Sequence, residues 1–482
     1  MKRKSIYTIL LLVLMSMGTA CSTDDSNEPV GEEPGENPGE VPSQDYEALD
    51  LAALDNGQGV MMQAFYWDVE PRHQWWELLE DKVADWAATG VDRIWLPVAT
   101  KGQSGGYSMG YDPSDYFDFG EYHQHGTTPT RFGTREELES LIAKAQGLGM
   151  EVIADIVLNH NSGGGSQYNP YREKDTYTLF DQDNGNASGK FNRNYEHYHP
   201  NSIHEHDPEA MFYEEQDVCH DHPYVQQWLW EGEESVARYY KEVMGFDGWR
   251  FDYVKGFEPW VIRQWMETVG GFAVGEMWEG NAEVLVDWVE AAGIPAFDFA
   301  AFYKMEEAFD RYNDLNYLSR DMLRKTHPDK AVTFVANHDT EKDEHQDNRI
   351  ARENKMKSYA YILTHDGYPT IFYLDYEDQD FQEELKQLIR IHNSLAIGEV
   401  EVLYVDKDEY VMRRMGTGNN PGLVLYINTS NGTKRRAVNT LWNDQPVMDY
   451  SGNTSYSTMT DETGRVYLEA PANGYAIYSI ME

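Results

Sequence analysis

Residues 247–256 read DGWRFDYVKG, in which a short strand-like run is followed directly by a carboxylate, Asp252. Three comparable runs occur elsewhere and also lead into polar residues. They are VIADIVLNH at 152–160, FAVGE at 272–276 and VTFVANHD at 332–339. In a barrel of parallel strands, the carboxyl ends of all strands meet at one mouth. Acids that lie far apart in the sequence can therefore converge on a single bond.

The chain alternates strand-like and helix-like segments from about residue 58 onward. Eight strands are predicted, at 60–66, 91–96, one ending near 157, 247–252, 272–276, 296–299, 332–336 and 370–374. Helices are predicted between them, at 75–89, 136–148, 225–244, 281–292 and 349–364. This order is typical of an α/β protein with a (β/α)8 TIM barrel. After about residue 396 short alternating stretches predict an antiparallel β domain.

The N-terminus resembles an export signal. Three basic residues precede an apolar stretch at 9–15, and Cys21 follows small residues in a context that resembles a lipoprotein cleavage site. We therefore expect residues 1–20 to be a lipoprotein signal peptide and Cys21 to carry a lipid. The alternative is an ordinary secretory signal with an incidental cysteine. Residues 22–45 contain no basic residue and little apolar surface, so we expect 21–45 to be a disordered acidic linker.

Composition narrows the range of partners. The chain has 482 residues, is 41% hydrophobic and has a formal net charge of −44. A surface this acidic opposes a polyanion, so we expect no nucleic-acid partner, whereas neutral glycans are not repelled. The two cysteines are Cys21 and Cys219. If Cys21 is acylated, no intrachain disulfide can form, and Cys219 becomes a candidate metal ligand.

Four motifs occur together in the order found in one enzyme family. They are DIVLNH (155–160), GWRFD (248–252), GE (275–276) and NHD (337–339). With them, the chain from about residue 57 resembles the α-amylase family of retaining glycoside hydrolases. MQAFYWD (62–68), GGYSMGYD (105–112) and DVCH (217–220) resemble its archaeal thermophilic branch. The resemblance implies a barrel at 46–158 and 223–395, an inserted metal-binding domain at 159–222 after the third strand, and a C-terminal antiparallel β-sandwich domain at 396–482.

The resemblance also implies catalytic roles. Asp252 matches the nucleophile that forms a covalent glycosyl-enzyme, and Glu276 matches the acid/base. Asp339 matches the third acid, which stabilises the distorted sugar. Arg250 should keep Asp252 ionised, while burial should raise the pKa of Glu276. Retaining chemistry predicts that the two reacting carboxyl groups lie roughly 5–5.5 Å apart.

Further family positions imply sugar and metal binding. The sugar-binding matches are Tyr111, His160, Arg250, Lys255 and His338. The implied calcium ligands are Asn159, Asp207, Glu209, Asp217 and Gly256, and the implied zinc ligands are His199, His204 and Cys219. For the zinc set the alternative is two exposed histidines and a buried thiol. Tyr107 and Trp278 are further candidate sugar platforms, with packing as the alternative.

The function implied by the resemblance is endo-hydrolysis of α-1,4-glucosidic bonds in starch-like glucans. A maltooligosaccharide-forming amylase or a transglycosylase is an alternative within the family. An inactive surface glycan-binding lipoprotein is an alternative from another class, and the three intact acids argue against it. We expect an exported monomer that is anchored in the bacterial envelope, at the outer membrane or cell surface, and that contacts a membrane only through the lipid on Cys21.

Overall fold

A computed structural model describes residues 46–54, 57–205, 212–342 and 349–482. The predicted signal peptide and linker, and the candidate calcium ligands Asp207 and Glu209, lie outside these residues. No helix within the described ranges is both long and apolar enough to cross a bilayer.

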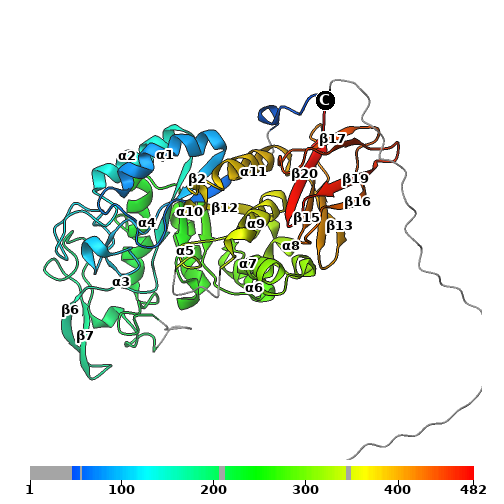
Figure 1. Cartoon of the computed structure of the whole chain (residues 1–482). Coiled ribbons are helices and arrows are strands. Elements are labelled where there is room, and N and C mark those ends of the chain that lie inside the picture. The colour runs from blue at the N-terminus through cyan, green and yellow to red at the C-terminus, as the bar shows by residue number, and fades with distance from the viewer. Residues whose placement is uncertain (1–45, 55–56, 206–211, 343–348) are drawn as a thin grey trace, which may run out of the picture. The chain divides into compact units, whose positions relative to one another are not determined.

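Eight parallel strands close into a barrel, which confirms the predicted fold class (Figure 1). Around the barrel the order is β1-β12-β11-β10-β9-β8-β5-β2. Their bounds are β1 Val60–Gln63, β2 Val91–Trp95, β5 Glu151–Ile156, β8 Gly248–Phe251, β9 Phe272–Gly275, β10 Ala296–Phe297, β11 Ala331–Phe334 and β12 Tyr368–Phe372. Most strands end one or more residues before the apolar run that predicted them, because the last residues of the run turn into the loops at the mouth.

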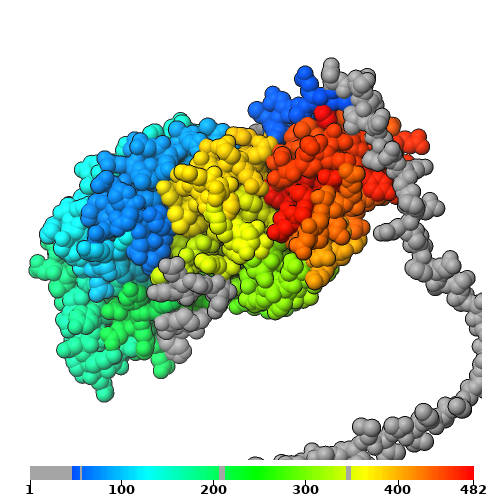
Figure 2. Space-filling view, in the orientation of Figure 1, coloured from blue at the N-terminus to red at the C-terminus, as the bar shows by residue number. Residues whose placement is uncertain are grey.

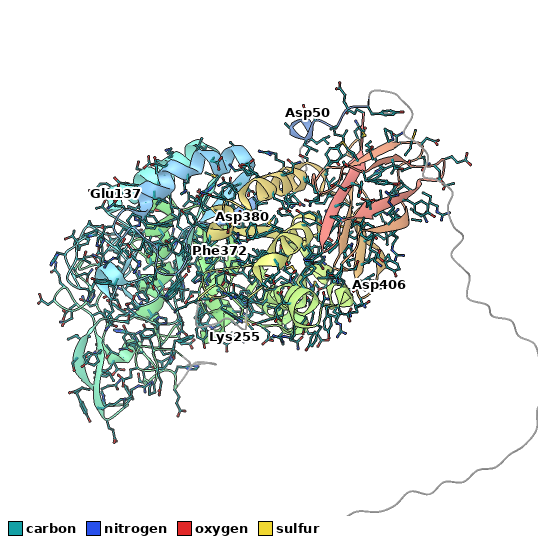
Figure 3. All side chains as sticks on the ribbon, in the orientation of Figure 1. Asp50, Glu137, Lys255, Phe372, Asp380 and Asp406 are labelled. Atoms are coloured by element: carbon teal, nitrogen blue, oxygen red, sulfur yellow. The ribbon has the colours of Figure 1, made fainter. Side chains whose placement is uncertain are left out.

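Helices cover the outside of the barrel. They are α1 Trp75–Thr89, α2 Arg135–Gly147, α3 Pro223–Gln226, α4 Val236–Arg238, α5 Pro259–Val269, α6 Ala282–Ala292, α7 Phe299–Glu306, α8 Leu323–Thr326, α9 Arg352–Thr364, α10 Tyr373–Tyr376 and α11 Gln382–Leu395. Local sequence sets their ends. At α2, Thr134 and Glu137 form a capping box, and Glu137 is labelled beside this helix in Figure 3. At α1, Gly90 ends the helix with a φ of 107°.

The prediction of one helix over 225–244 is wrong. Helix α3 continues into a π-helical turn, η4 (Gln227–Glu231), which ends at Gly232. A new helix, α4, starts after Ser235 and passes into a second π-helical turn, η5 (Tyr239–Met244). The apolar periodicity runs through both pieces, but Gly232 breaks the backbone between them. A third π-helical turn, η7 (Glu307–Arg311), extends α7.

Short elements occur in the connections between the longer helices and strands. They are the ribbon β3 Lys101–Gly102 with β4 Pro113–Asp115, the hairpin β6 Gly165–Asn169 with β7 Lys174–Leu179, and the 3-10 turns η1 Leu51–Ala53, η2 Gly105–Tyr107, η3 Tyr195–His197, η6 Val254–Gly256, η8 Leu315–Ser319 and η9 Pro328–Lys330. The long connection between β5 and α3 therefore carries its own hairpin, as an inserted domain requires.

The C-terminal segment forms two antiparallel sheets. One has the order β13-β14-β15-β20-β17-β18 and the other pairs β16 with β19. The strands are β13 Val400–Val405, β14 Glu409–Arg414, β15 Leu423–Asn428, β16 Lys434–Asn439, β17 Pro446–Asp449, β18 Ser457–Met459, β19 Arg465–Ala470 and β20 Gly474–Ile480. One buried cluster joins Tyr426 of the first sheet to Leu468 of the second, so the two sheets form a sandwich. Helix α9 packs on β15 and β20, and Figure 2 shows this orange and red segment against the yellow helices.

Candidate active site

The three predicted acids all lie at the mouth of the barrel. Asp252 directly follows β8 and Glu276 directly follows β9. Their backbone N–H groups continue the barrel ladder, since Asp252 N donates to Ile156 O at 2.9 Å and Glu276 N donates to Phe251 O at 2.9 Å. Asp339 lies on the loop after β11. The parallel register therefore holds Asp252 and Glu276 on neighbouring strand ends.

A buried guanidinium connects these two acids. Arg250 Nη1 lies 2.9 Å from Asp252 Oδ1, and Arg250 Nη2 lies 2.6 Å from Glu276 Oε1. Because two nitrogens of one planar group bind the two carboxylates, the acids must be close neighbours. The predicted carboxyl separation stays a prediction, but the shared guanidinium agrees with it.

Burial governs the protonation of both acids. It raises the pKa of Glu276, with Asp252 and Asp339 adding to the rise, while Arg250 opposes it. Burial also raises the pKa of Asp252 in spite of the Arg250 cation. The expectation that the Arg250 cation keeps Asp252 ionised leaves out desolvation, which has the larger effect on this pKa. A raised pKa is the property that an acid catalyst needs at neutral pH.

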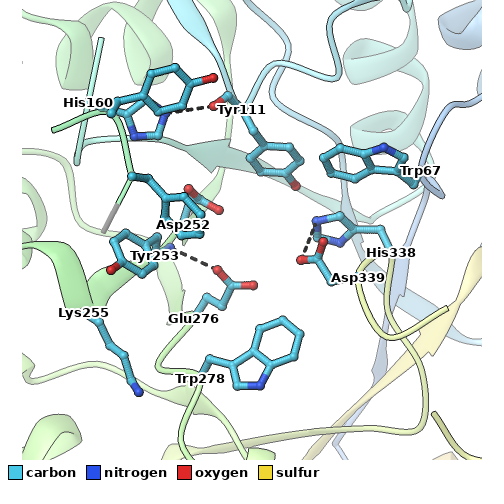
Figure 4. Close-up of a pocket in the computed structure, with 12 residues that line it drawn as sticks. Trp67, Tyr111, His160, Asp252, Tyr253, Lys255, Glu276, Trp278, His338 and Asp339 are labelled. Atoms are coloured by element: carbon cyan, nitrogen blue, oxygen red, sulfur yellow. Dashed lines mark hydrogen bonds and ion pairs between the residues drawn. The ribbon is translucent and has the colours of Figure 1, made fainter. Parts of the chain in front are cut away.

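The backbone of Tyr253 is adapted to the site. This residue has a φ of 41° and a ψ of 54°, in the left-handed region that costs a non-glycine residue about 1 kcal/mol or more. In this conformation its N–H donates to Glu276 Oε2 at 3.1 Å. A strained residue directly after Asp252 therefore helps to orient the neighbouring acid (Figure 4).

A histidine and an asparagine hold Asp339. His338 Nε2 lies 3.3 Å from Asp339 Oδ2, as Figure 4 shows. The backbone N–H of Asp339 donates to Asn337 Oδ1 at 2.9 Å. On its other edge, His338 Nδ1 lies 2.8 Å from Nε2 of the buried Gln63.

These side chains surround one cavity of about 460 Å³ (Figure 4). Its lining consists of Trp67, Tyr111, His160, Phe212, Tyr213, Asp252, Tyr253, Lys255, Glu276, Trp278, His338 and Asp339. The structure thus brings the predicted catalytic and sugar-binding residues together, with Arg250 buried below them. His160 donates from Nε2 to Tyr111 O at 2.8 Å, and burial lowers the pKa of His160 to about 4, so its ring is neutral at pH 7.

Comparison with known proteins agrees with this geometry. The family description for the α-amylase catalytic domain matches residues 80–384, and that for the α-amylase C-terminal domain matches residues 423–479. The chain belongs to the α-amylase family. It is therefore a glycoside hydrolase. Its assignment to the archaeal thermophilic branch stays a prediction.

Several characterised relatives support the family assignment. The α-amylase of Bacillus licheniformis is 26% identical over 490 residues, which cover 89% of this chain and 94% of the relative. The cytoplasmic α-amylase of Escherichia coli K12 is 26% identical over an alignment that covers 88% of this chain and 99% of the relative. A glucan 1,4-α-maltohexaosidase of a Bacillus species is 28% identical over an alignment that covers 69% of this chain and 73% of the relative.

Solved structures of low sequence identity share the fold. The crystal structure of an Anoxybacillus α-amylase superposes with a TM-score of 0.67 at 18% identity, covering 88% of this chain and 98% of that one. A cyclomaltodextrin glucanotransferase with a three-domain arrangement superposes with a TM-score of 0.65 at 17% identity. The superposition covers 88% of this chain and 99% of that structure.

Several lining residues of this α-amylase family member were not predicted as site residues. Trp67 lies parallel to Tyr111, with ring centroids 5.7 Å apart. Tyr213 stacks on His160 at 4.2 Å, and Phe212 packs edge-on against Tyr253 at 4.8 Å. Exposed aromatic residues in a long polar insertion are a signal that could have identified Phe212 and Tyr213. The candidate platform Trp278 lines the cavity and stacks on Phe299, with ring centroids 4.7 Å apart.

Three of the candidate calcium ligands lie within the described residues, and the structure places them near one another. Asn159 Oδ1 is buried, and no hydrogen-bond donor reaches it from the described residues. A Cβ atom on Gly256 would lie only 1.9 Å from that oxygen, so this position requires glycine. Asp217 lies alongside, because residues 160 and 217 form a backbone bridge and Val218 N donates to Asn159 O. The amide oxygen of Asn159, the carboxylate of Asp217 and the backbone carbonyl oxygen of Gly256 are ligand types that calcium prefers.

The candidate zinc ligands are not gathered into a site. His199 and His204 have ring centroids 5.3 Å apart, but His199 Nδ1 lies 3.0 Å from Asp217 Oδ2. Cys219 is a buried free thiol. Within the four described ranges, no three His, Cys, Asp or Glu side chains are grouped so that they could hold a metal ion. The structure therefore gives no support to a zinc site.

Proposed function

We propose that the protein hydrolyses internal α-1,4-glucosidic bonds of starch-like glucans with retention of configuration. The single observation that supports this most strongly is the arrangement around Arg250, which binds Asp252 and Glu276 through different nitrogens at the floor of an aromatic cavity. Two close carboxyl groups of this kind suit the two-step mechanism.

In the first step, an Asp252 oxygen attacks the anomeric carbon and the bond from that carbon to the departing oxygen breaks. Glu276 gives its proton to the departing oxygen, which leaves as a neutral hydroxyl. In the second step, Glu276 takes a proton from water, and the water oxygen displaces Asp252. Arg250 remains between the two acids throughout and balances the charge that moves between them.

The remaining lining positions the sugar. The Asp339 carboxylate accepts hydrogen bonds from sugar hydroxyls, and the neutral rings of His160 and His338 bind further hydroxyls. Tyr111 offers a ring on which the C–H face of a sugar can stack. Lys255, whose Nζ lies 3.5 Å from Glu279 Oε2, and Trp278 bind the sugar units on the departing side.

Calcium would be held by Asn159, Asp217 and the backbone at Gly256, with Asp207 and Glu209 as further candidates. When bound, it would brace the loop after β5 against the loop after Asp252. Its effect is structural, because Asn159, Asp217 and Gly256 do not line the cavity.

For cellular location, we propose export and lipid anchoring at Cys21. The basic residues, the apolar stretch and the cysteine near the N-terminus support this. Incorporation of labelled palmitate in a bacterial host should require Cys21, and equal labelling of a Cys21→Ser variant would contradict it.

Soluble starch tests the proposed activity. Wild-type protein should release a mixture of short oligomers whose new ends have the α configuration. Asp252→Asn should lower kcat on the order of 10³-fold or more while starch still binds. Asp247→Asn, at the other end of β8, is the control. One dominant product length would favour the maltooligosaccharide-forming alternative, and starch binding without any product would favour the inactive glycan-binding protein.

A further inference from the structure

Gln63 is a buried polar residue at the end of an apolar strand. It is the last residue of β1, its exposed fraction is 0%, and it follows Val60-Met61-Met62. A buried amide needs hydrogen-bond partners, because an unpaired one costs about 1–3 kcal/mol. The partner of its Nε2 atom is Nδ1 of His338, at 2.8 Å.

The other edge of the same imidazole favours one position of the ring hydrogen. His338 Nε2 lies 3.3 Å from Asp339 Oδ2. A carboxylate oxygen accepts hydrogen bonds, so at this distance a hydrogen on Nε2 is favoured over a bare nitrogen that would face the oxygen lone pairs. In a neutral ring Nδ1 is then a bare acceptor, and it requires a donor on its side. The amide N–H of Gln63 is that donor, so both edges of the ring agree on one tautomer.

The ring cannot turn away from these two partners. Tyr111 and Trp67 lie parallel to His338, with centroids 5.3 Å and 5.9 Å away, and Phe65 lies 4.9 Å away. The charged and titratable groups that act on it are Asp339, Arg250, Asp155 and Lys342. Burial lowers the pKa of His338 more than the carboxylates raise it, so the ring is neutral at neutral pH.

We propose that Gln63 is a positioning residue that fixes His338 as the Nε2–H tautomer. In this form the ring donates from Nε2 toward Asp339 and toward the sugar that Asp339 grips, and Nδ1 is held by the amide. The sugar contact rests on the proposed function. The tautomer itself is a property of the free protein and can be tested without substrate.

Nitrogen-15 NMR of histidine-labelled protein measures the tautomer directly. The His338 signals are assigned by comparison with a His338→Gln variant. At pH 7 the wild type should show a protonated Nε2 and an unprotonated Nδ1 bonded to a donor. A protonated Nδ1 in the free wild-type protein would overturn the proposal, whether or not any glucan is cleaved.

Two substitutions separate positioning from packing. Gln63→Met keeps the length and removes the donor. It should lower kcat about 10- to 100-fold on a 4-nitrophenyl maltoheptaoside and leave KM within about threefold, because the misplaced donor matters most in the transition state. Met62→Leu, one residue away and with nearly conserved volume, should retain wild-type kinetics. Wild-type kcat in Gln63→Met would contradict the proposal.

Gln63→Glu provides a readout that packing alone cannot produce. The introduced carboxyl group and His338 then share one additional proton, which keeps Nε2–H in place at lower pH. As pH rises through the pKa of this pair, the proton is lost, the carboxylate draws the remaining ring hydrogen to Nδ1, and Nε2 becomes bare. Activity should therefore fall at an alkaline pH where the wild type is still active. If Gln63→Met does not fold, the proposal is still tested by the alkaline loss of activity in Gln63→Glu and by the wild-type NMR spectrum. An unchanged pH profile in Gln63→Glu would count against the proposal.

Discussion

Asp155 Oδ1 lies 2.8 Å from Arg250 Nη1, so the carboxylate of the third barrel strand in sequence order pairs with the cation below the catalytic acids. Its second oxygen accepts hydrogen bonds from Tyr111 at 2.8 Å and from Trp95 Nε1 at 3.1 Å. Asp155 thus orients both the guanidinium and the aromatic ring on which a sugar can stack. It is buried and does not line the cavity.

Replacing Asp155 by Asn should lower kcat about tenfold and move the acid limb of the pH profile. The amide has one accepting oxygen, so its NH₂ group must face either Arg250 or the Tyr111 and Trp95 donors. The negative charge of Asp155 helps to raise the pKa of Asp252. Its removal should shift the acid limb of kcat/KM toward lower pH.

The pH profile of this variant is best compared with that of Asp92→Asn. Asp92 is a carboxylate near the start of β2 and bonds to Tyr368 at the opposite end of the barrel. This change removes the same charge far from the mouth and should leave the acid limb in place. An unshifted acid limb in Asp155→Asn would show that Asp155 does not act on Asp252.

The wild-type enzyme should have a bell-shaped profile of kcat/KM centred near neutral pH. Asp252 must be ionised, and burial raises its pKa, so activity is lost as pH falls through a value above the ~4 of an exposed aspartate. Glu276 must be protonated, and burial raises its pKa as well, so activity persists above the usual glutamate range and is lost as pH rises through the raised pKa. Rates measured from pH 3 to 10 on a soluble maltooligosaccharide test this. An acid limb at ~4 would show that Asp252 is not desolvated in the working enzyme.

The barrel could be predicted from sequence because each of its eight strands is an apolar run bounded by turn signals. Strand ends were less certain, since Ala64, Phe65 and Tyr66 continue the apolar run of β1 but already belong to the loop. The break at Gly232 was missed because hydrophobic periodicity continues on both sides of it. Periodicity reports which face is buried and does not report whether the backbone is continuous.

The acids could be predicted because they follow strands, and strand ends meet at the mouth. For Phe212 and Tyr213 the sequence offers only aromatic residues within a polar insertion, and no local pattern tells which barrel loop such a segment will contact. Gln63 carried a signal that was overlooked: an amide inside an apolar strand is rare enough to indicate a buried partner. That partner, His338, lies 275 residues away, a pairing that only the closed barrel reveals.

Tyr107 should help to bind longer glucans. Its side chain is 69% exposed, and the Arg72 guanidinium covers one ring face at 4.3 Å. It lines a hollow of about 290 Å³ that shares Trp67, Tyr111 and Tyr213 with the catalytic cavity. Loss of a stacking platform worth about 0.5–1.5 kcal/mol should raise KM about two- to twelvefold for long maltooligosaccharides.

Short substrates should be unaffected by Tyr107→Ala, because they do not reach this hollow. Tyr168→Ala is the matched control, since Tyr168 is 60% exposed on the β6–β7 hairpin and lines neither cavity. Kinetics on maltotriose and maltoheptaose derivatives distinguish the two variants. An equal rise in KM for both substrate lengths would argue that Tyr107 supports the loop and does not contact sugar.

Removal of calcium should destabilise the protein. An ion that binds only the folded state at about 100 times its Kd adds about 2.7 kcal/mol to the free energy of unfolding, so excess chelator should lower Tm by several degrees. Added calcium should restore it, and magnesium should restore it poorly because the two ions prefer different ligand geometries. If chelator left the wild-type Tm unchanged, the oxygens around Asn159 would not bind calcium.

A pair of variants places this effect at Asn159. Asn159→Ala removes the buried Oδ1 oxygen, so its Tm should be low from the start and respond little to chelator. Asn161→Ala is the control, because that residue is equally buried two positions away and its side chain donates to Pro113 O and Ser114 O. Its Tm should be lower than that of the wild type and should still fall further with chelator. An equal response of both variants to chelator would place the ion elsewhere, since only the first change removes a proposed ligand.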